Sequence, residues 1–407
     1  MNCGLIGRKL GHSFSPKIHS LLGNYPYRLI PLEPEEVEDF LRKGEFHGLN
    51  VTIPYKKAVV PYCDAFCQTL TDQARRIGSV NTILRRPDGT LLGDNTDYDG
   101  FLYLLKSAGA QVEGRKALVL GSGGASLTVR SVLSELGARE IITISRSGEN
   151  NYQNLDRHAD AQIIVNATPV GMYPNNGVSP VDLDQFPQCE GVFDLIYNPS
   201  KTQLLLQAQR RGLIWGNGLG MLVAQAKAAS ERFQGKKLPD ELVADITAKL
   251  ERETKNILLI GMPGCGKTTI GKALAQKLGR PLADVDEKII EEAGCSIPHI
   301  FASEGEEGFR VREHRALAQI AKESGQVISA GGGIVTRPEN RDRMEENSVV
   351  VWLRRDLDRL PTDGRPVSQS VPREELYRRR APLYEAMAQV TVDNNGTVDE
   401  IIRKVME

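Results

Sequence analysis

The sequence reads Gly261-Met262-Pro263-Gly264-Cys265-Gly266-Lys267-Thr268 between a short apolar segment and a segment of helical periodicity. This stretch fits the phosphate-loop pattern G-x-x-x-x-G-K-[ST], and a preceding strand and a following helix are the context that the pattern requires. Its glycines allow backbone N–H groups to turn inward around phosphate oxygens, and the helix N-terminus adds positive potential. An incidental glycine turn is the alternative, and the flanking elements argue against it. The stretch therefore predicts an α/β domain that binds a nucleoside triphosphate, with Lys267 on the phosphates and Thr268 on Mg²⁺.

Strands and helices alternate after the phosphate loop. Apolar segments predict strands at residues 257–260, 327–329 and 349–353. Apolar positions at helical spacing predict a helix at 268–278. Such alternation is typical of a parallel, doubly wound sheet. Because a short charged run at 251–255 precedes this system, we expect a domain boundary there and a phosphate-loop domain over residues 254–407.

A second alternating pattern lies upstream of the boundary. It predicts strands at residues 116–120, 140–144 and 162–165, and a glycine-rich turn follows the first of them. Earlier apolar segments at 3–7, 49–53 and 79–84, together with a helix at 239–250, indicate a separate lobe. We therefore expect a substrate-binding lobe over residues 1–93, completed by about 214–253, and a Rossmann-like dinucleotide-binding domain over 94–213.

The composition excludes several classes of protein. The 407 residues include 51 Lys and Arg against 52 Asp and Glu, so the chain is not built as a general binder of nucleic acid. No apolar run reaches 18 residues, which argues against a membrane span. The first residues lack the pattern of a secretory signal, and the six cysteines form no C-x-x-C pair. We expect a cytoplasmic protein with reduced thiols, either a monomer or a homodimer.

Charged residues after the phosphate loop indicate a small anionic acceptor. Asp284 and Asp286 follow the first helix of this half, and the glycine run 331–333 follows a later strand. Arg310 and Arg380 come from separate segments, and we expect no second acidic cluster to pair them. Single arginines are usually surface ion-pair partners, but planar guanidinium groups are also the best ligands for a carboxylate. The pattern therefore favours a phosphoryl transfer to a small anionic acceptor.

With these motifs in order, residues 256–407 resemble shikimate kinase. The resemblance implies a five-stranded parallel sheet of the nucleoside-monophosphate-kinase type. It implies that Asp286 accepts the proton of the substrate hydroxyl, and that Arg310 and Arg380 clamp the substrate carboxylate beside Gly332. Asp284 would hold Mg²⁺ through water together with Thr268, Arg365 of the lid would touch the transferred phosphate, and Arg359 would stack on adenine. The predicted ATP contacts are Gly261, Gly264, Cys265, Gly266, Lys267, Thr268 and Thr269. The lid is short, and it lacks the apolar pair that the family has after Arg365-Pro366.

A glycine turn in the first half suggests a dinucleotide. Gly121-Ser122-Gly123-Gly124-Ala125 follows a strand and opens a helix, so a pyrophosphate could bind the helix N-terminus. An acid at the end of the next strand would favour NAD. The chain instead has Ser145-Arg146-Ser147, and an arginine flanked by hydroxyls suits the 2′-phosphate of NADP. An exposed arginine with no ligand is the alternative.

Lys56 and Asp97 are candidates for an acid–base pair. Each lies near the end of an apolar run, as do polar residues such as Asn50, Thr52 and Asn81, and such residues tend to converge on a cleft. A carboxylate beside an ammonium keeps both groups charged and holds the proton donor in place. As isolated residues, a solvated lysine and a turn aspartate would be the more ordinary interpretation.

These motifs, with Ser13-x-Ser15 and residues 218–225, closely resemble shikimate dehydrogenase over residues 1–253. The resemblance implies a two-lobed dehydrogenase in which Lys56 and Asp97 are catalytic. The implied substrate-binding residues are Ser13, Ser15, Asn50, Thr52, Asn81, Tyr197 and Gln225. The implied cofactor-binding residues are Gly121, Gly123, Gly124, Ala125, Ser145, Arg146, Ser147, Thr168 and Gly218.

Together the resemblances predict a bifunctional enzyme of chorismate and aromatic amino acid biosynthesis. The first half would reduce 3-dehydroshikimate with NADPH, and the second would phosphorylate shikimate at the 3-hydroxyl with ATP and Mg²⁺. One alternative is a quinate or shikimate dehydrogenase that uses NAD, against which Arg146 argues. Another is a non-catalytic sensor of shikimate and nucleotide, which could have lost Lys56 or Asp286 and has lost neither.

Overall fold

The structure is a computed structural model that describes residues 1–11, 13–67, 69–360 and 372–406. The predicted lid residue Arg365 lies outside these residues. The chain divides into two compact units. The first consists of residues 1–171, 178–197 and 207–250, and the second consists of 172–177, 198–206 and 251–407.

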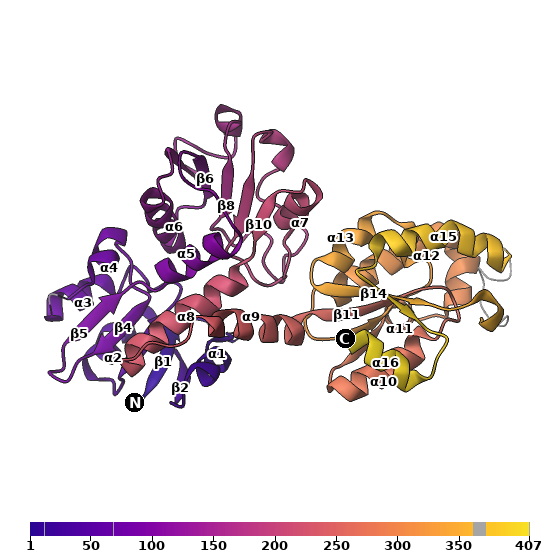
Figure 1. The fold of residues 1–407 in the computed structure, drawn as a ribbon, viewed down its shortest axis with the longest axis horizontal. Coiled ribbons are helices and arrows are strands. Elements are labelled where there is room, and N and C mark those ends of the chain that lie inside the picture. Colours follow the sequence, from indigo (N-terminus) through magenta and orange to yellow (C-terminus); the bar gives the residue numbers. More distant parts are fainter. Residues whose placement is uncertain (12, 68, 361–371, 407) are drawn as a thin grey trace. The chain divides into compact units, whose positions relative to one another are not determined.

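The first lobe of the first unit is a five-stranded mixed sheet (Figure 1). Its strand order is β2-β1-β3-β4-β5, with bounds β1 Cys3–Gly7, β2 Tyr27–Pro31, β3 Gly48–Val51, β4 Thr82–Arg85 and β5 Leu91–Asp94. Strands β1, β2 and β3 are parallel, whereas β4 is antiparallel to both of its neighbours. Its helices are α1 Ser15–Leu22, α2 Val37–Lys43, α3 Val60–Cys67 and α4 Asp72–Ile77.

Two strands of this lobe are shorter than predicted. Strand β3 ends at Val51, before the cis Ile53–Pro54 bond, where proline has no N–H to offer a neighbouring strand. Strand β4 begins only at Thr82, because the backbone N–H of Val80 donates to the carbonyl of Lys56 at 2.8 Å and leaves the ladder. Both departures place Lys56 against the residues that lead into β4.

The second lobe is a parallel five-stranded sheet with strand order β10-β9-β8-β6-β7. The strands are β6 Lys116–Leu120, β7 Glu140–Ile144, β8 Ile163–Asn166, β9 Gly191–Asp194 and β10 Ile214–Gly216. Every residue of the central strand β8 and of its neighbour β6 is buried, as in sheets covered by helices on both faces. The helices that follow the first lobe along the chain are α5 Asp97–Ser107, α6 Gly124–Glu135, α7 Gln203–Arg210, α8 Gly218–Gln234 and α9 Glu241–Thr254. The predicted Rossmann-like sheet is therefore confirmed.

Helix α8 completes the first lobe, and its residues Leu219 and Val223 share an apolar cluster with Ile18 of α1. Two glycines permit its close approach. A Cβ on Gly48 would lie 2.2 Å from the Phe233 ring, and one on Gly100 of α5 would lie 2.6 Å from the Met221 carbonyl oxygen. Helices α5 and α8 therefore pack with backbones nearly in contact, and both carry predicted site residues.

The second unit is a parallel sheet with strand order β12-β13-β11-β14-β15 (Figure 1). The strands are β11 Asn256–Ile260, β12 Leu282–Asp284, β13 Val327–Ser329, β14 Ser348–Arg354 and β15 Val390–Asp393. The helices are α10 Lys267–Leu278, α11 Val285–Ala293, α12 Ile297–Ala321, α13 Glu339–Glu345, α15 Arg373–Met387 and α16 Val398–Met406. The predicted five-stranded parallel sheet is confirmed.

Helix α9 is longer than predicted. It continues through the charged residues that were expected to form the boundary and ends at Thr254, two residues before β11 begins. Glu251, Arg252 and Glu253 are good helix formers, and no glycine or proline stops the helix before them. No helix in the described part of the chain is long and apolar enough to cross a membrane.

Candidate active sites

The predicted acid–base pair of the first unit is formed. The Nζ of Lys56 donates to Oδ2 of Asp97 at 2.5 Å, and their side chains are only 20% and 9% exposed. Asp97 begins helix α5, while Lys56 lies in the turn after Pro54, the cis-proline that follows β3. A largely buried ion pair of this kind holds the ammonium in a fixed orientation, which is what a proton donor needs.

Asn50 and Asn81 lie beside each other at this edge of the sheet. Asn50 Nδ2 donates to Thr82 Oγ1 at 3.2 Å and to the Asn81 carbonyl at 3.5 Å. Asn81 Oδ1 accepts from the backbone N–H of Thr96 at 2.6 Å and so fixes the entry to helix α5. Both asparagines are buried. Asn81 is therefore partly a structural residue, which its place in the sequence did not indicate.

The remaining predicted substrate residues frame the same edge. Ser13 Oγ donates to Ser15 Oγ at 3.1 Å at the start of α1. The rings of Phe14 and Tyr197 are 5.6 Å apart, which brings residue 197 next to this serine pair. Burial raises the pKa of Tyr197, so its hydroxyl stays protonated and can donate. Gln225 lies on α8 and faces α5, because a Cβ added to Gly100 of α5 would lie 3.1 Å from the Cβ of Gln225.

The glycine turn of the second lobe reaches the catalytic pair. Gly121 has φ +107°, and a Cβ there would lie 2.9 Å from the Thr168 methyl group. A Cβ on Gly124, the first residue of α6, would lie 3.8 Å from Cβ of Lys56. The N-terminus of α6, which is the predicted pyrophosphate site, is therefore adjacent to the predicted proton donor.

Other predicted cofactor residues lie at the carboxyl ends of the same sheet. Thr168 follows β8 and is held by Asn166 Oδ1, which accepts from the Thr168 hydroxyl at 2.7 Å. Arg146 is exposed just after β7, with Ser145 bridged to Asn151. Gly218 begins α8, and a Cβ there would overlap the Leu195 carbonyl at 2.0 Å. Ligands of open α/β sheets bind at these strand ends.

In the second unit, the phosphate loop has the expected conformation. Gly261, Gly264 and Gly266 all have positive φ, at 146°, 82° and 94°. Lys267 is buried and folds back over the loop, because its Nζ donates to the carbonyls of Gly261 and Met262 at 3.0 and 3.1 Å. Its ammonium is thus held at the loop where the phosphates would lie.

Oxygen ligands suited to Mg²⁺ are grouped beside this loop. Thr268 Oγ1 lies 3.1 Å from Asp284 Oδ2 and 3.3 Å from Ser329 Oγ. A carboxylate with two hydroxyls fits a Mg²⁺ ion that keeps several waters and also binds substrate phosphates. Asp284 also caps helix α11 by accepting from the N–H of Asp286 at 3.0 Å, which fixes both acids. Ser329 was not predicted.

Arg310 and Arg380 meet at the glycine run that follows β13. A Cβ on Gly333 would lie 2.1 Å from Arg310 Nη1, so only glycine leaves room for this guanidinium. Arg380 Nη1 donates to the Gly332 carbonyl at 3.1 Å. Burial lowers the pKa of Arg380, and the positive charge of Arg310 acts in the same direction. Both guanidinium groups are therefore buried at the same glycine run.

The expectation that no acidic cluster pairs these arginines was wrong. Arg310 Nη1 donates to Glu313 Oε2 at 2.7 Å, and Nη2 donates to Glu306 Oε1 at 3.0 Å. Burial opposes the charge of Arg310, but Glu313 and Glu306 outweigh it and raise its pKa. A Cβ on Gly331 would lie 2.5 Å from Glu313 and 3.2 Å from Asp286, so the two carboxylates are neighbours. The i, i+3 spacing of Arg310 and Glu313 on a helix was the signal in the sequence.

The strand end of β14 adds residues at the nucleotide side. Arg359 Nη1 donates to the Asn395 carbonyl at 3.0 Å, in the loop after β15. Asn394 of that loop donates to the carbonyl of Cys265 in the phosphate loop. Arg355, which was not predicted, has Nη1 3.7 Å from the position of a Cβ on Gly266. These contacts bring Arg359 and Arg355 to the region of the phosphate loop.

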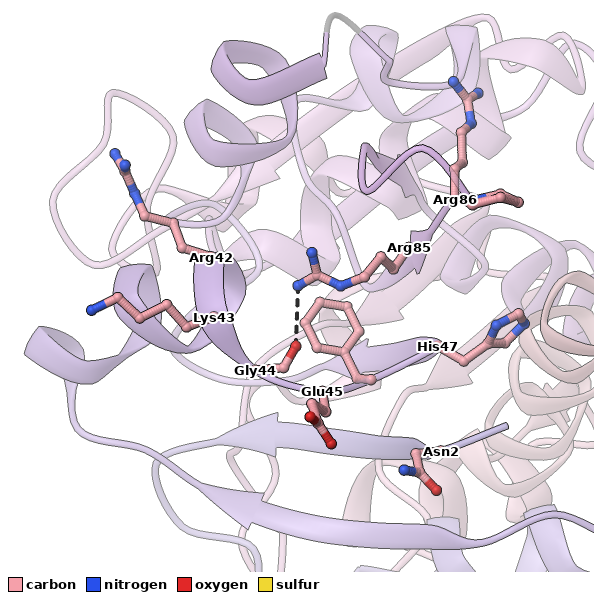
Figure 2. Close-up of a pocket in the computed structure, with 10 residues that line it drawn as sticks. Asn2, Arg42, Lys43, Gly44, Glu45, His47, Arg85 and Arg86 are labelled. Atoms are coloured by element: carbon pink, nitrogen blue, oxygen red, sulfur yellow. Dashed lines mark hydrogen bonds between the residues drawn. The ribbon is translucent and has the colours of Figure 1, made fainter.

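A separate depression of about 530 Å³ lies at the other end of the strands of the first sheet. Its lining residues come just before β1, just before β3 and at the end of β4. Figure 2 shows that Arg42, Lys43 and Arg86 do not converge on one point. Arg42 and Lys43 pair with Glu38 and Asp39 of their own helix. Arg85 caps α2 through the Leu41 and Gly44 carbonyls and lies over Phe46. This depression contains none of the predicted site residues.

Comparisons with known proteins match both halves of the chain. The family model for the shikimate dehydrogenase substrate binding domain matches residues 5–83, and the model for shikimate kinase matches residues 263–407. The NADP-dependent shikimate dehydrogenase of Clostridium beijerinckii is 35% identical over 271 residues, which are 62% of this chain and 98% of that protein.

Two solved structures are similar over the same part. Shikimate dehydrogenase 1 from Peptoclostridium difficile is 36% identical with a TM-score of 0.56, covering 62% of this chain and 98% of that one. The shikimate dehydrogenase of Thermus thermophilus, solved with NADP(H) and shikimate, is 30% identical with a TM-score of 0.55, covering 61% and 99%.

The folds and sites define a dinucleotide-dependent dehydrogenase joined in one chain to a phosphate-loop kinase. The chain belongs to the shikimate dehydrogenase family, and its second half carries a shikimate kinase domain. It is a bifunctional enzyme of the shikimate pathway that uses NADP(H) and ATP. The two resemblances seen in the sequence are thereby confirmed.

Proposed function

We propose that Lys56 protonates the carbonyl oxygen of 3-dehydroshikimate while Asp97 holds its ammonium in place. Their 2.5 Å contact, beside the N-terminus of α6, is the observation that carries this assignment. NADPH, when bound, supplies the hydride. In the reverse direction Lys56 would take up the hydroxyl proton of shikimate, with Asp97 again keeping it oriented.

The substrate is bound, in this proposal, at the edge that carries the serine pair and the asparagines. Ser13, Ser15 and Tyr197 offer hydroxyl donors to the carboxylate. Thr52, Asn50, Asn81 and Gln225 hydrogen-bond the ring hydroxyls. Arg146 binds the 2′-phosphate of NADP from the end of β7, where its exposed guanidinium is open to a ligand.

In the kinase half, Asp286 would orient the 3-hydroxyl of shikimate and accept its proton. Its neighbours Arg310 and Arg380 bind the substrate carboxylate, so the three residues fix both ends of a small ring. Lys267 neutralises the charge of the transferred phosphoryl group, and Thr268 with Asp284 holds Mg²⁺. Phosphoryl transfer needs this kind of positioning and charge neutralisation more than it needs covalent chemistry.

One incubation tests both halves together. The protein is mixed with 3-dehydroshikimate, NADPH, ATP and Mg²⁺, and the products are identified by mass. We expect shikimate 3-phosphate from the parent chain, shikimate alone from Asp286→Asn, and unchanged 3-dehydroshikimate from Lys56→Ala. Conversion of added shikimate by Lys56→Ala shows that its kinase half is intact. Shikimate 3-phosphate at parent rates from either variant would contradict the assignment.

We also propose that the dehydrogenase occupies residues 1–253 and the kinase residues 254–407. We further propose that the protein is a cytoplasmic monomer or homodimer that does not bind nucleic acid. Size-exclusion chromatography with light scattering tests the oligomeric state, and a single mass near twice that of the chain would identify the homodimer.

A further inference from the structure

A buried aromatic cluster lies behind Asn50. His19 of α1 stacks on Tyr27 of β2, with ring centres 3.9 Å apart and an angle of 9° between the rings. His19 Nδ1 lies 2.6 Å from the Tyr25 hydroxyl, which in turn lies 2.7 Å from Ser230 of α8. Only 1% of His19 is exposed. None of these residues belongs to the motifs that identified the site.

Tyr27 joins this cluster to two proposed substrate ligands. Its hydroxyl donates to Asn50 Oδ1 at 2.7 Å. The Ser15 hydroxyl also hydrogen-bonds Tyr27, which partly offsets the rise that burial causes in the pKa of Tyr27. A phenol has one hydrogen, so it donates to Asn50 and accepts from Ser15. One hydroxyl thus connects residues 15 and 50.

The tautomer of His19 follows from its neighbours. Tyr25 has one hydroxyl hydrogen and donates it to Ser230, so His19 Nδ1 carries the ring proton and donates to the Tyr25 oxygen. His19 Nε2 is buried and has no hydrogen-bond partner among the described residues. His19 therefore acts on Tyr27 through the stacking of the two rings.

We propose that Tyr27 is a positioning residue of the dehydrogenase site, which holds the Asn50 amide with its oxygen inward and its Nδ2 toward Thr82, and that His19 supports it by stacking on the Tyr27 ring. An asparagine amide can rotate by half a turn at little cost in shape, so its orientation depends on the donors around it. Here the Tyr27 hydroxyl donates to Oδ1. The Nδ2 group is thereby kept on the side of Thr82 and the Asn81 carbonyl.

This inference rests on the role proposed for Asn50, and the experiment separates the two. KM and kcat for shikimate oxidation by NADP⁺ are measured for Tyr27→Phe, Asn50→Ala and the double variant. A neutral hydrogen bond is worth roughly 0.5 to 1.5 kcal/mol, so Tyr27→Phe should raise the KM for shikimate about two- to tenfold. The kcat should change by less than about twofold, because the lost contact serves ground state and transition state alike.

The double variant provides the decisive comparison. If Tyr27 acts through Asn50, adding Tyr27→Phe to Asn50→Ala should raise KM by less than about 1.5-fold further. Fully multiplicative effects, or a parent KM in Tyr27→Phe, would overturn the inference while leaving Asn50 as a ligand. A parent KM in Asn50→Ala would overturn the proposed role of Asn50, and the inference with it.

Two controls exclude a general loss of structure. Tyr55→Phe removes a buried hydroxyl of the same lobe, which donates to the Leu32 carbonyl at 2.5 Å, and should leave KM unchanged. His19→Phe keeps a planar ring stacked on Tyr27, whereas His19→Leu does not, so His19→Phe should lie closer to the parent KM. The kinase activity of the same chain should be unaltered in all variants that fold. Equal KM values for His19→Phe and His19→Leu would remove His19 from the proposal.

Discussion

Arg310 and Glu313 lie three residues apart on helix α12 and form an ion pair of 2.7 Å in which Glu313 is fully buried. A buried carboxylate of this kind depends on its partner, because removing one member leaves an uncompensated charge. The pair also lies against Gly331 and Gly333, beside the predicted base Asp286. Arg310 therefore both contributes to the proposed substrate clamp and balances the charge of Glu313, whereas Arg380 contributes to the clamp alone. Alanine variants of Arg310 and Arg380 should therefore give different results.

Arg380→Ala should be the cleaner test of the carboxylate clamp. Arg380 donates to a backbone carbonyl, so its removal leaves the Arg310–Glu313 ion pair in place, and the KM for shikimate should rise roughly 10- to 100-fold with the KM for ATP little changed. Arg310→Ala should raise the KM for shikimate and also lower the free energy of unfolding by about 3 to 5 kcal/mol. Steady-state kinetics and urea unfolding distinguish the two variants. If Arg310→Ala and Arg380→Ala had equal free energies of unfolding, Glu313 would be neutral in the folded protein.

Lys56→Ala and Asp97→Asn should disable only the dehydrogenase. Removing a positioned proton donor costs roughly 10²- to 10⁴-fold in rate, and Asp97→Asn should cost less than Lys56→Ala because it only loosens the ammonium. NADPH oxidation and ATP consumption are followed in separate assays. Near-normal NADPH oxidation in Lys56→Ala would assign the proton transfer to another group.

Arg146→Ala should weaken NADPH and spare NADH. A hydrogen bond to a charged group is worth roughly 1.5 to 3 kcal/mol, which corresponds to a KM for NADPH raised about 10- to 150-fold. Arg146→Lys keeps the positive charge but loses the planar guanidinium group, so its KM for NADPH should lie between those of the parent and of Arg146→Ala. Equal changes for both cofactors would make Arg146 a structural residue.

Acid should destabilise the first unit through His19. Burial lowers the pKa of His19 from 6.5 to about 3, against the opposing effect of Asn50, and the other rings around it, Tyr25, Tyr27 and Phe233, carry no charge. Between these two pKa values His19 binds a proton in the unfolded chain but not in the folded chain. The free energy of unfolding is therefore complete above pH 6.5 and falls as the pH decreases toward 3. Between pH 7 and 5 the loss should be about 2 kcal/mol. His19→Gln should remove that part of the slope in urea unfolding, and an unchanged slope would contradict it.

The sequence predicted those features that depend on local spacing. The phosphate loop, the glycine turn at 121–125 and the order of strands and helices all follow from patterns within about fifteen residues. The contact between Tyr27 and Asn50 could not be predicted in this way, because it requires β2 and β3 to lie on either side of β1. Glu313 was missed for a different reason. Its spacing to Arg310 was visible, but its burial depends on the glycine run that approaches it from β13.

The last turn of α9 bears on how the two activities can be produced separately. The N–H of Gly325 donates to the Thr254 carbonyl at 2.7 Å, and Arg280 donates to the carbonyls of Lys255 and Arg252. These carbonyls are thus part of the hydrogen-bonding framework of the second unit. A kinase expressed from Asn256 onward would lack three backbone acceptors, whereas one that begins at Glu251 or earlier would keep them. Only Lys255 lies between the end of α9 and the start of β11, so limited proteolysis should find no extended segment to cut there.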